Sequence, residues 1–162
     1  MPSFDDLLVS SGGFKGLFAE IQENGQNLEK EVEGFLREES GLFGLAKFSV
    51  KKLEPGLAEI TFPYSDTVAR HGGIVHGGII SFALDTVGGL ACMPNNSGID
   101  QVTIELTVNF LKPLKKEPFR AIGRELRNGR TTSVAEMEMR GGGDELCAVA
   151  LGTWYKILKP RE

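Results

Sequence analysis

The chain has 162 residues, 41% of them hydrophobic and 25% charged, which is typical of one soluble domain with a single core. A net charge of -4 argues against a general nucleic-acid binder, which usually carries a basic excess. The chain shows no signal-peptide pattern and no run approaching the ~20 apolar residues that span a bilayer, so we expect a cytoplasmic protein without membrane association.

The first forty residues predict a helical extension. Residues 1–12 are mixed in character and lead into a loop at residues 10–13. Apolar residues recur at helical spacing over residues 14–39, and Gly25 is expected to interrupt this stretch. We therefore divide the chain into a helical extension at residues 1–41, packed on the domain or on a partner subunit, and a main domain at residues 42–158.

The main domain predicts an antiparallel sheet around one helix. Period-two runs at residues 43–53 and 57–62 flank the turn Glu54-Pro55-Gly56, which is a hairpin signal. After a loop at residues 63–73, residues 77–93 are apolar nearly all round and predict a buried helix. Four more strands are expected at residues 102–111, 119–126, 131–140 and 146–157, separated by Asn-Gly and Gly-Gly turns. The fold class is α+β, and one helix cannot cover six strands on both faces, which indicates an oligomer.

Both histidines lie in the segment RHGGIVHGG at residues 70–78, which leads directly into the predicted helix. Paired glycines at a helix N-terminus expose backbone N–H groups, and the helix dipole adds partial positive charge. These features suit a carbonyl oxygen that becomes an oxyanion. As an alternative, His76 could cap the helix or order the loop.

Asp85 is the only acid between Asp66 and Asp100, and it lies inside the apolar helix. A carboxylate there is costly unless it has a partner or a task, so it is a candidate base or nucleophile. A structural acid bonded to Thr86 or to the backbone is the alternative. Gly77 and Asp85 are eight residues apart, about 12 Å along a helix, so they cannot hold one carbonyl within one chain. If both act, Asp85 comes from a second subunit of a dimer.

The pattern His76-Gly77-Gly78, six residues, Asp85-Thr86 resembles the PaaI-type branch of the hotdog-fold acyl-CoA thioesterases. The run TVNFLKP at residues 107–113 is similar to that family's strand ending in an aromatic, a basic residue and proline. The likeness covers about residues 42–158. It implies a hotdog fold, homodimers that often pair into homotetramers, and hydrolysis of acyl- or aryl-CoA, with coenzyme A as part of the substrate and no cofactor or metal.

The resemblance also implies roles for single residues. The Gly77 N–H polarises the thioester carbonyl, His76 orients the site, and Asp85 of the neighbouring subunit is the base or nucleophile. Thr103 matches an assisting hydroxyl, although strand alternation puts it on a polar face with Glu105 and Thr107. The expected substrate-binding residues are Arg70, His71, Gly78, Gly129, Arg130 and Thr131.

Arg70 stands where the family commonly has an asparagine. Its guanidinium could bind a carboxylate or phosphate but cannot accept a hydrogen bond. A non-catalytic acyl-CoA-binding or sensor protein is therefore the alternative function. A hydratase of this fold would carry a histidine five residues after Asp85, where this chain has Leu90. Six basic residues could meet coenzyme A phosphates or form a solvated face: Lys112, Lys115, Lys116, Arg124, Arg127 and Arg130.

Overall fold

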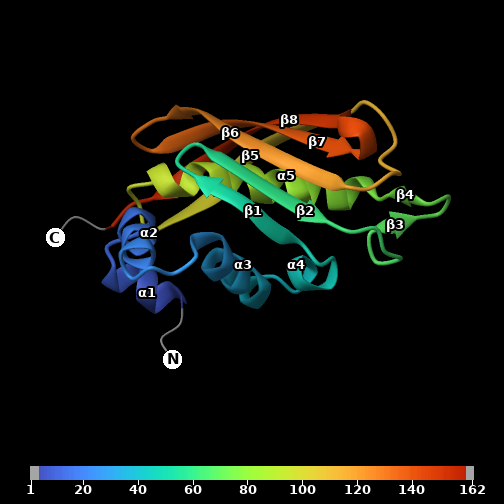
Figure 1. The fold of residues 1–162 in the computed structure, drawn as a ribbon. Coiled ribbons are helices and arrows are strands. Elements are labelled where there is room, and N and C mark those ends of the chain that lie inside the picture. The colour runs from blue at the N-terminus through green and yellow to red at the C-terminus, as the bar shows by residue number, and fades with distance from the viewer. Residues whose placement is uncertain (1–3, 160–162) are drawn as a thin grey trace.

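A six-stranded antiparallel sheet curves around the long helix α5 (Gly77–Cys92) in the computed structural model, which describes residues 4–159 (Figure 1). The strand order is β1-β2-β6-β7-β8-β5. The strands are β1 (Ser49–Glu54), β2 (Leu57–Phe62), β5 (Asp100–Phe110), β6 (Phe119–Asn128), β7 (Thr132–Gly141) and β8 (Glu145–Ile157). The predicted curved sheet around one helix is confirmed, and α5 ends one residue before its predicted limit.

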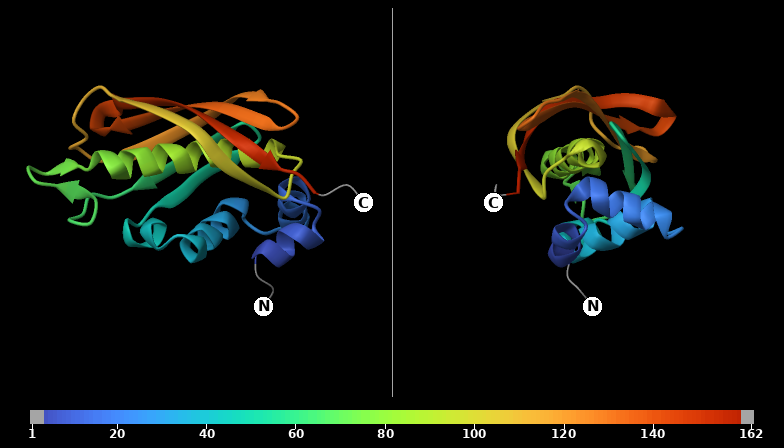
Figure 2. Two further views of the ribbon diagram at one scale, coloured as in Figure 1. Left: turned by 180° about the vertical axis from the view of Figure 1, so that it is seen from behind. Right: turned by 90° about the vertical axis from the view of Figure 1, so that its left-hand side faces the viewer.

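The helices of the N-terminal extension lie on the side of α5 away from the sheet (Figure 2). They are α1 (Phe4–Ser10), α2 (Phe14–Glu23), α3 (Leu28–Glu39) and α4 (Gly41–Leu45). The break at Gly25 is confirmed, since its φ of 71° ends the first helical stretch. The loop expected at residues 10–13 is confirmed for residues 11–13, which separate α1 from α2.

The helix α4 corrects the predicted strand at residues 43–53. The apolar spacing of this segment fits either a helix or a strand, and the contacts with residues before and after it decide which one forms. The Ser40 hydroxyl accepts a hydrogen bond from the Phe43 N–H, which starts the short helix. Phe43 is fully buried and stacks on Phe48, 5.4 Å between ring centroids. The strand therefore begins only at Ser49.

The helix α5 fills the concave side of the sheet. Its buried residues include Ile80, Leu84, Val87 and Leu90. The close approach depends on glycine, because a Cβ at Gly123 of β6 would lie 2.5 Å from the Val87 carbonyl oxygen. By length and composition alone, the segment Gly77–Asn95 is apolar enough to cross a membrane. Its apolar character is accounted for by its place as the core helix, packed against the strands of the sheet.

The loop expected at residues 63–73 contains an unpredicted hairpin tip. Strands β3 (Ala69–Arg70) and β4 (Ile74–Val75) pair outside the main sheet, and the turn between them uses positive φ at Gly72 and Gly73. The hairpin projects beyond the N-terminal end of α5 (Figure 1). It therefore carries Arg70 and His71 to the same end of the molecule as Gly77.

The two edges of the sheet differ. At the β1 edge, Glu33 of α3 accepts a hydrogen bond from the Val50 N–H at 2.9 Å, and Glu29 accepts one from the Leu53 N–H at 3.3 Å. These carboxylates occupy strand donors that another chain would need. Among the described residues, β5 pairs only with β8, so its other side is a free edge.

Candidate active site

The first half of the site is the N-terminus of α5. The His76 side chain is the N-cap, and its Nδ1 accepts a hydrogen bond from the Gly78 N–H at 2.9 Å. The capping role considered for His76 is thus observed, and it occupies the Gly78 donor. The Gly77 N–H has no acceptor among residues 4–159. One amide with the positive end of the helix dipole behind it therefore stays free for an incoming oxygen.

A cavity of about 350 Å³ opens at this helix end. Gly77, Arg70 and Lys112 are among its lining residues, together with Phe110 of β5. The Arg70 side chain is exposed and donates from Nη1 to the His71 carbonyl oxygen at 3.2 Å. His71 is exposed and does not line this cavity. The cavity combines apolar walls with two cationic side chains, which suits a substrate carrying phosphate groups.

The second half of the site surrounds Asp85. Asp85 is half-buried on α5, and its Oδ1 accepts a hydrogen bond from the Thr103 hydroxyl at 2.7 Å. The alternative partner, Thr86, makes no such bond. A charge-assisted hydrogen bond of this length fixes the orientation of the carboxylate and leaves its other oxygen available. Asp85 and Thr103 line a cavity of about 190 Å³ that Trp154 also lines.

A β-bulge at Ile104 brings Thr103 to Asp85. Thr103 pairs with Trp154 and Glu105 pairs with Thr153, so Ile104 is an extra residue in β5. Thr103 therefore faces the helix, as do Leu106 and Val108. The expectation that Thr103 shares a face with Glu105 and Thr107 is wrong for this reason. No feature of the sequence marks the bulge.

The two cavities have no lining residue in common. This agrees with the separation of Gly77 and Asp85 along α5, about 12 Å for eight residues. Sequence reasoning did not assign to the site several side chains that the fold brings to the two cavities, among them Phe110 beside Gly77, and Leu36, Met93 and Trp154 in the cavity of Asp85. Leu36 belongs to the N-terminal extension, and nothing in its local pattern marks it for this cavity.

The turn at residues 129–131 lies at the opposite end of the sheet from Gly77. Its position is fixed by Lys156, which is 2% exposed and whose ammonium donates to the Gly129 carbonyl oxygen at 2.8 Å and to the Asn128 side chain. Burial lowers the pKa of the Lys156 ammonium. Arg130 is exposed, and Thr131 accepts a backbone hydrogen bond from Lys156. The turn is thus held on the end of the molecule where α5 finishes.

The six basic residues that cluster in sequence separate in space. Lys112 bonds Glu145 at 2.6 Å and lies near Gly77, while Arg130 lies at the far turn. They form no single phosphate-binding patch within one chain. No group of three His, Cys, Asp or Glu side chains suited to a metal ion occurs in the part of the chain that the structure describes.

Comparison with known proteins agrees with this architecture. The sequence model of the thioesterase superfamily matches residues 72–148, which include α5 and the strands β5, β6 and β7. "Putative esterase SSO2140" of Saccharolobus solfataricus is 41% identical over 126 residues, 78% of this chain and 90% of that protein.

Solved structures match in fold as well. A thioesterase family protein from Silicibacter pomeroyi superposes with a TM-score of 0.71 at 26% identity, covering 81% of this chain and 98% of its own. The PaaI protein from the phenylacetic acid degradation operon of E. coli gives a TM-score of 0.66 at 21% identity, covering 75% and 88%. The chain belongs to the thioesterase superfamily and has the hotdog fold of its PaaI-like members.

Proposed function

We propose that the protein is an acyl-CoA thioesterase, which hydrolyses an acyl- or aryl-CoA to the free acid and coenzyme A. Membership of the superfamily supports thioester or ester hydrolysis. The observation that carries the proposal is the pair of half-sites on α5: the unpartnered Gly77 N–H and the half-buried Asp85 carboxylate. One supplies an oxyanion donor, and the other supplies a base or nucleophile.

The proposed reaction uses these two groups at one carbonyl. The Gly77 N–H donates to the thioester oxygen while Asp85 takes a proton from water, and the hydroxide attacks the carbonyl carbon. The tetrahedral oxyanion then collapses, the C–S bond breaks, and the coenzyme A sulfur receives the proton held by Asp85. In the alternative course Asp85 attacks directly, and water cleaves the resulting anhydride to the same products. The hydrogen bond from Thr103 orients the carboxylate in either course.

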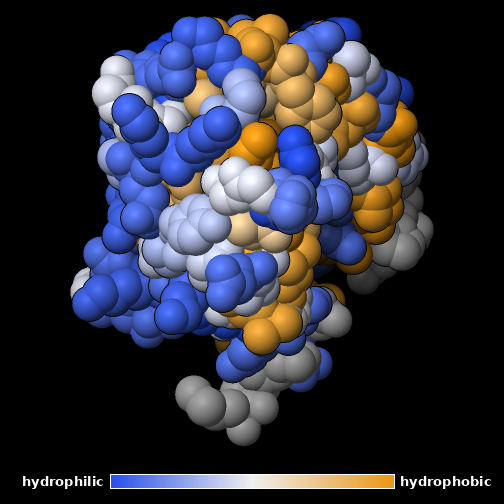
Figure 3. Space-filling model, turned by 90° about the vertical axis from the view of Figure 1, so that its right-hand side faces the viewer, coloured by the Kyte–Doolittle hydropathy of each residue, from blue (hydrophilic) through white to orange (hydrophobic). Residues whose placement is uncertain are grey.

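Both groups reach one carbonyl only if they come from different subunits, so the proposal includes a homodimer with two shared sites. The free edge of β5 supports this arrangement, since Val102, Ile104 and Phe110 are 46%, 58% and 55% exposed there. Apolar surface also gathers along one side of the molecule viewed from the Gly77 end (Figure 3). The covered β1 edge offers no equivalent surface. Further pairing into a tetramer is compatible with this dimer.

In the shared site, a substrate would contact basic and polar groups of both subunits. Arg70 adjoins Gly77 of one subunit, whereas Gly129, Arg130 and Thr131 belong to the Asp85 end of the other. We propose that these groups, with His71 at the hairpin tip, bind the coenzyme A arm. Two buried free cysteines fit a reducing compartment, and we propose the cytoplasm as the site of action.

Asp85→Asn tests the role of the carboxylate, because the amide keeps its size and removes its basicity. We expect release of coenzyme A from a panel of acyl-CoAs to fall at least ~100-fold, which is a typical share for a general base. Asp144→Asn is the matched control, since Asp144 lies on an exposed turn and is expected to keep wild-type turnover. Tight binding without release, unchanged by Asp85→Asn, would instead support the acyl-CoA sensor.

Mixed dimers test whether the sites are shared. Asp85→Asn and Gly77→Pro subunits are each expected to be nearly inactive alone. After co-refolding, half of the dimers contain one of each, and each such dimer has one site with both groups intact. We therefore expect about a quarter of wild-type activity to return. No recovery in a mixture shown to contain heterodimers would contradict the shared site.

A further inference from the structure

A second apolar cavity adjoins the Asp85 cavity. Its volume is about 190 Å³, and it lies between α1, α2 and α3 of the N-terminal extension. Leu36 of α3 and Met93 at the end of α5 line both cavities. The two cavities are therefore neighbours, with these two side chains between them.

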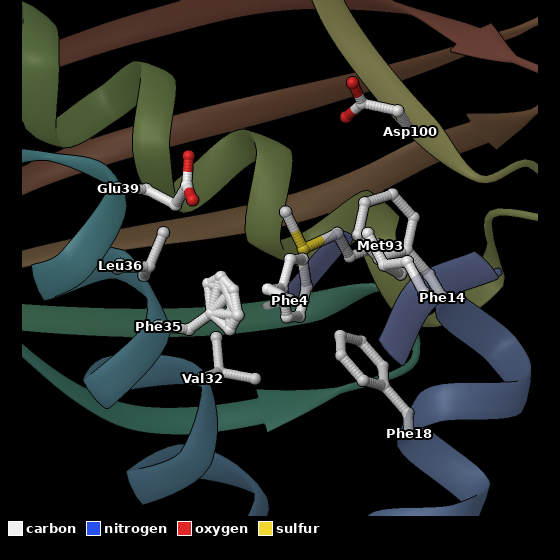
Figure 4. Close-up of a pocket in the computed structure, with 10 residues that line it drawn as sticks. Phe4, Phe14, Phe18, Val32, Phe35, Leu36, Glu39, Met93 and Asp100 are labelled. Atoms are coloured by element: carbon white, nitrogen blue, oxygen red, sulfur yellow. The ribbon is translucent and has the colours of Figure 1, made fainter. Parts of the chain in front are cut away.

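Eight of the ten side chains that line the second cavity are apolar, and Figure 4 shows most of them. Four aromatic side chains and two aliphatic ones form most of its wall: Phe4, Phe14, Phe18, Phe35, Leu8 and Val32. Phe14 and Phe18 are held in the core at 1% and 5% exposure, and their rings lie 6.2 Å apart. A space lined in this way gains free energy by taking up a hydrocarbon.

We propose that this cavity is the subsite for the distal part of the acyl chain and that the N-terminal extension sets the acyl preference of the enzyme. The inference rests on the proposed function, which puts the thioester carbon beside Asp85. An acyl chain leaving that carbon meets Leu36 and Met93 first and the aromatic wall beyond them. An acetyl group has one carbon beyond the thioester carbonyl, so it stays beside Asp85 on the near side of Leu36 and Met93.

The charges at this cavity narrow the substrate class. Glu39 and Asp100 also line it, and both are exposed; their carboxylates lie on opposite sides of the cavity (Figure 4). No cationic side chain is present in its lining. The two carboxylates repel any carboxylate at the far end of an acyl group, so dicarboxylic acyl groups are disfavoured. The subsite therefore takes neutral apolar acyl groups longer than acetyl.

Eight of the ten residues that line the proposed subsite come from the N-terminal extension, and only Met93 and Asp100 belong to residues 72–148, the part that matches the superfamily. Catalytic groups and acyl selection would then come from different parts of the chain.

The test is a series of straight-chain acyl-CoAs from acetyl to decanoyl. For the wild type, kcat/KM is expected to rise about fourfold per added methylene as the tail enters the cavity. Leu36→Trp narrows the passage and should lower the ratio of octanoyl to acetyl kcat/KM at least ~10-fold. Phe35→Ala enlarges the cavity and should raise the ratio of decanoyl to octanoyl kcat/KM.

Leu45→Trp is the matched control, because Leu45 is 68% exposed on α4 and lines neither cavity. It should keep the wild-type ratio, and melting temperatures show whether each variant is folded. If both variants release coenzyme A and Leu36→Trp has the same ratio of octanoyl to acetyl kcat/KM as Leu45→Trp, the subsite is overturned and the proposed function stands.

If no acyl-CoA is hydrolysed, the proposed function fails and binding decides the subsite. Calorimetry with non-hydrolysable S-alkyl-CoA thioethers should then show the same chain-length dependence and the same loss in Leu36→Trp. Affinities that do not change with alkyl length would overturn the inference.

Discussion

Replacing Gly77 with proline removes the oxyanion donor and leaves the helix its natural first residue. Gly77 is the first residue of α5, where proline is favoured because its fixed φ suits the helix and its missing N–H has no helical partner. A residue before proline must be extended, and His76 already has φ -63° and ψ 135°. The substitution is therefore compatible with the backbone on both sides.

The expected loss follows from one missing donor. Removal of a single oxyanion donor costs about 10²–10³ in kcat, which corresponds to about 3–4 kcal/mol of transition-state stabilisation. The added Cβ costs little, since it would lie 3.4 Å from the Phe110 ring, an ordinary contact. We expect Gly77→Pro to lower kcat by this factor while the melting temperature stays near that of the wild type. Initial rates of coenzyme A release over a range of substrate concentrations measure kcat and KM separately.

Gly77→Ala separates the amide from the side chain. It places the same Cβ against Phe110 and keeps the N–H, so kcat should fall less than tenfold. If alanine and proline reduce kcat equally, the loss is steric and the amide has no part in it. A proline variant with near-normal turnover would refute the donor role outright.

Three further outcomes are expected. Thr103→Val removes the hydroxyl that donates to Asp85 and should lower kcat roughly tenfold with little change in KM, while Thr103→Ser should restore kcat. Thr107→Val, on the outer face of β5, is the control, and an equal loss of kcat in both valine variants would contradict the bulge. Gly88→Ala should lower the free energy of unfolding by about 1–2 kcal/mol in urea titrations, because its Cβ would lie 2.3 Å from the buried Trp154 ring. Gly34→Ala, whose Cβ would have no atom within 4 Å, should raise the free energy of unfolding by about 0.5–1 kcal/mol. A gain in stability for Gly88→Ala and a loss for Gly34→Ala would refute this packing. Burial raises the pKa of the Cys92 thiol to about 12, and Cys147 is buried as well, so neither cysteine should react with thiol reagents at about pH 8 until denaturant is added. The stability that the protonated Cys92 thiol contributes is full below its unfolded pKa of 9.0 and is lost as pH rises towards 12. Rapid labelling of the native protein would refute the burial of these thiols.

The sequence predicts those parts of the fold that depend on local pattern. The long apolar run at residues 77–93 predicts a core helix, and α5 occupies this place. The glycine of the Glu54-Pro55-Gly56 turn predicts the first hairpin, and Gly56 has a φ of 80°. The separation of Gly77 from Asp85 follows from helix geometry alone, and it anticipates the two half-sites. These predictions need no knowledge of distant contacts.

The remaining features depend on contacts that local pattern does not encode. The segment at Phe43 becomes helical because Ser40 caps it and Phe48 packs on it. Thr103 reaches Asp85 only through one unpaired residue in a strand whose alternation looks regular. Leu36 approaches the site because Glu29 and Glu33 hold α3 against β1, far along the chain.

The bulge at Ile104 solves a problem of parity. Thr103 and Phe110 are seven residues apart, and an odd separation in a regular strand puts two side chains on opposite faces. Because the bulge absorbs one residue, Thr103 meets Asp85 and Phe110 meets Gly77 on the same face. In the proposed dimer these contacts belong to two different catalytic centres. A strand shortened by one residue at the bulge would keep both contacts, whereas one lengthened by a residue would lose one of them, whatever side chains it carried.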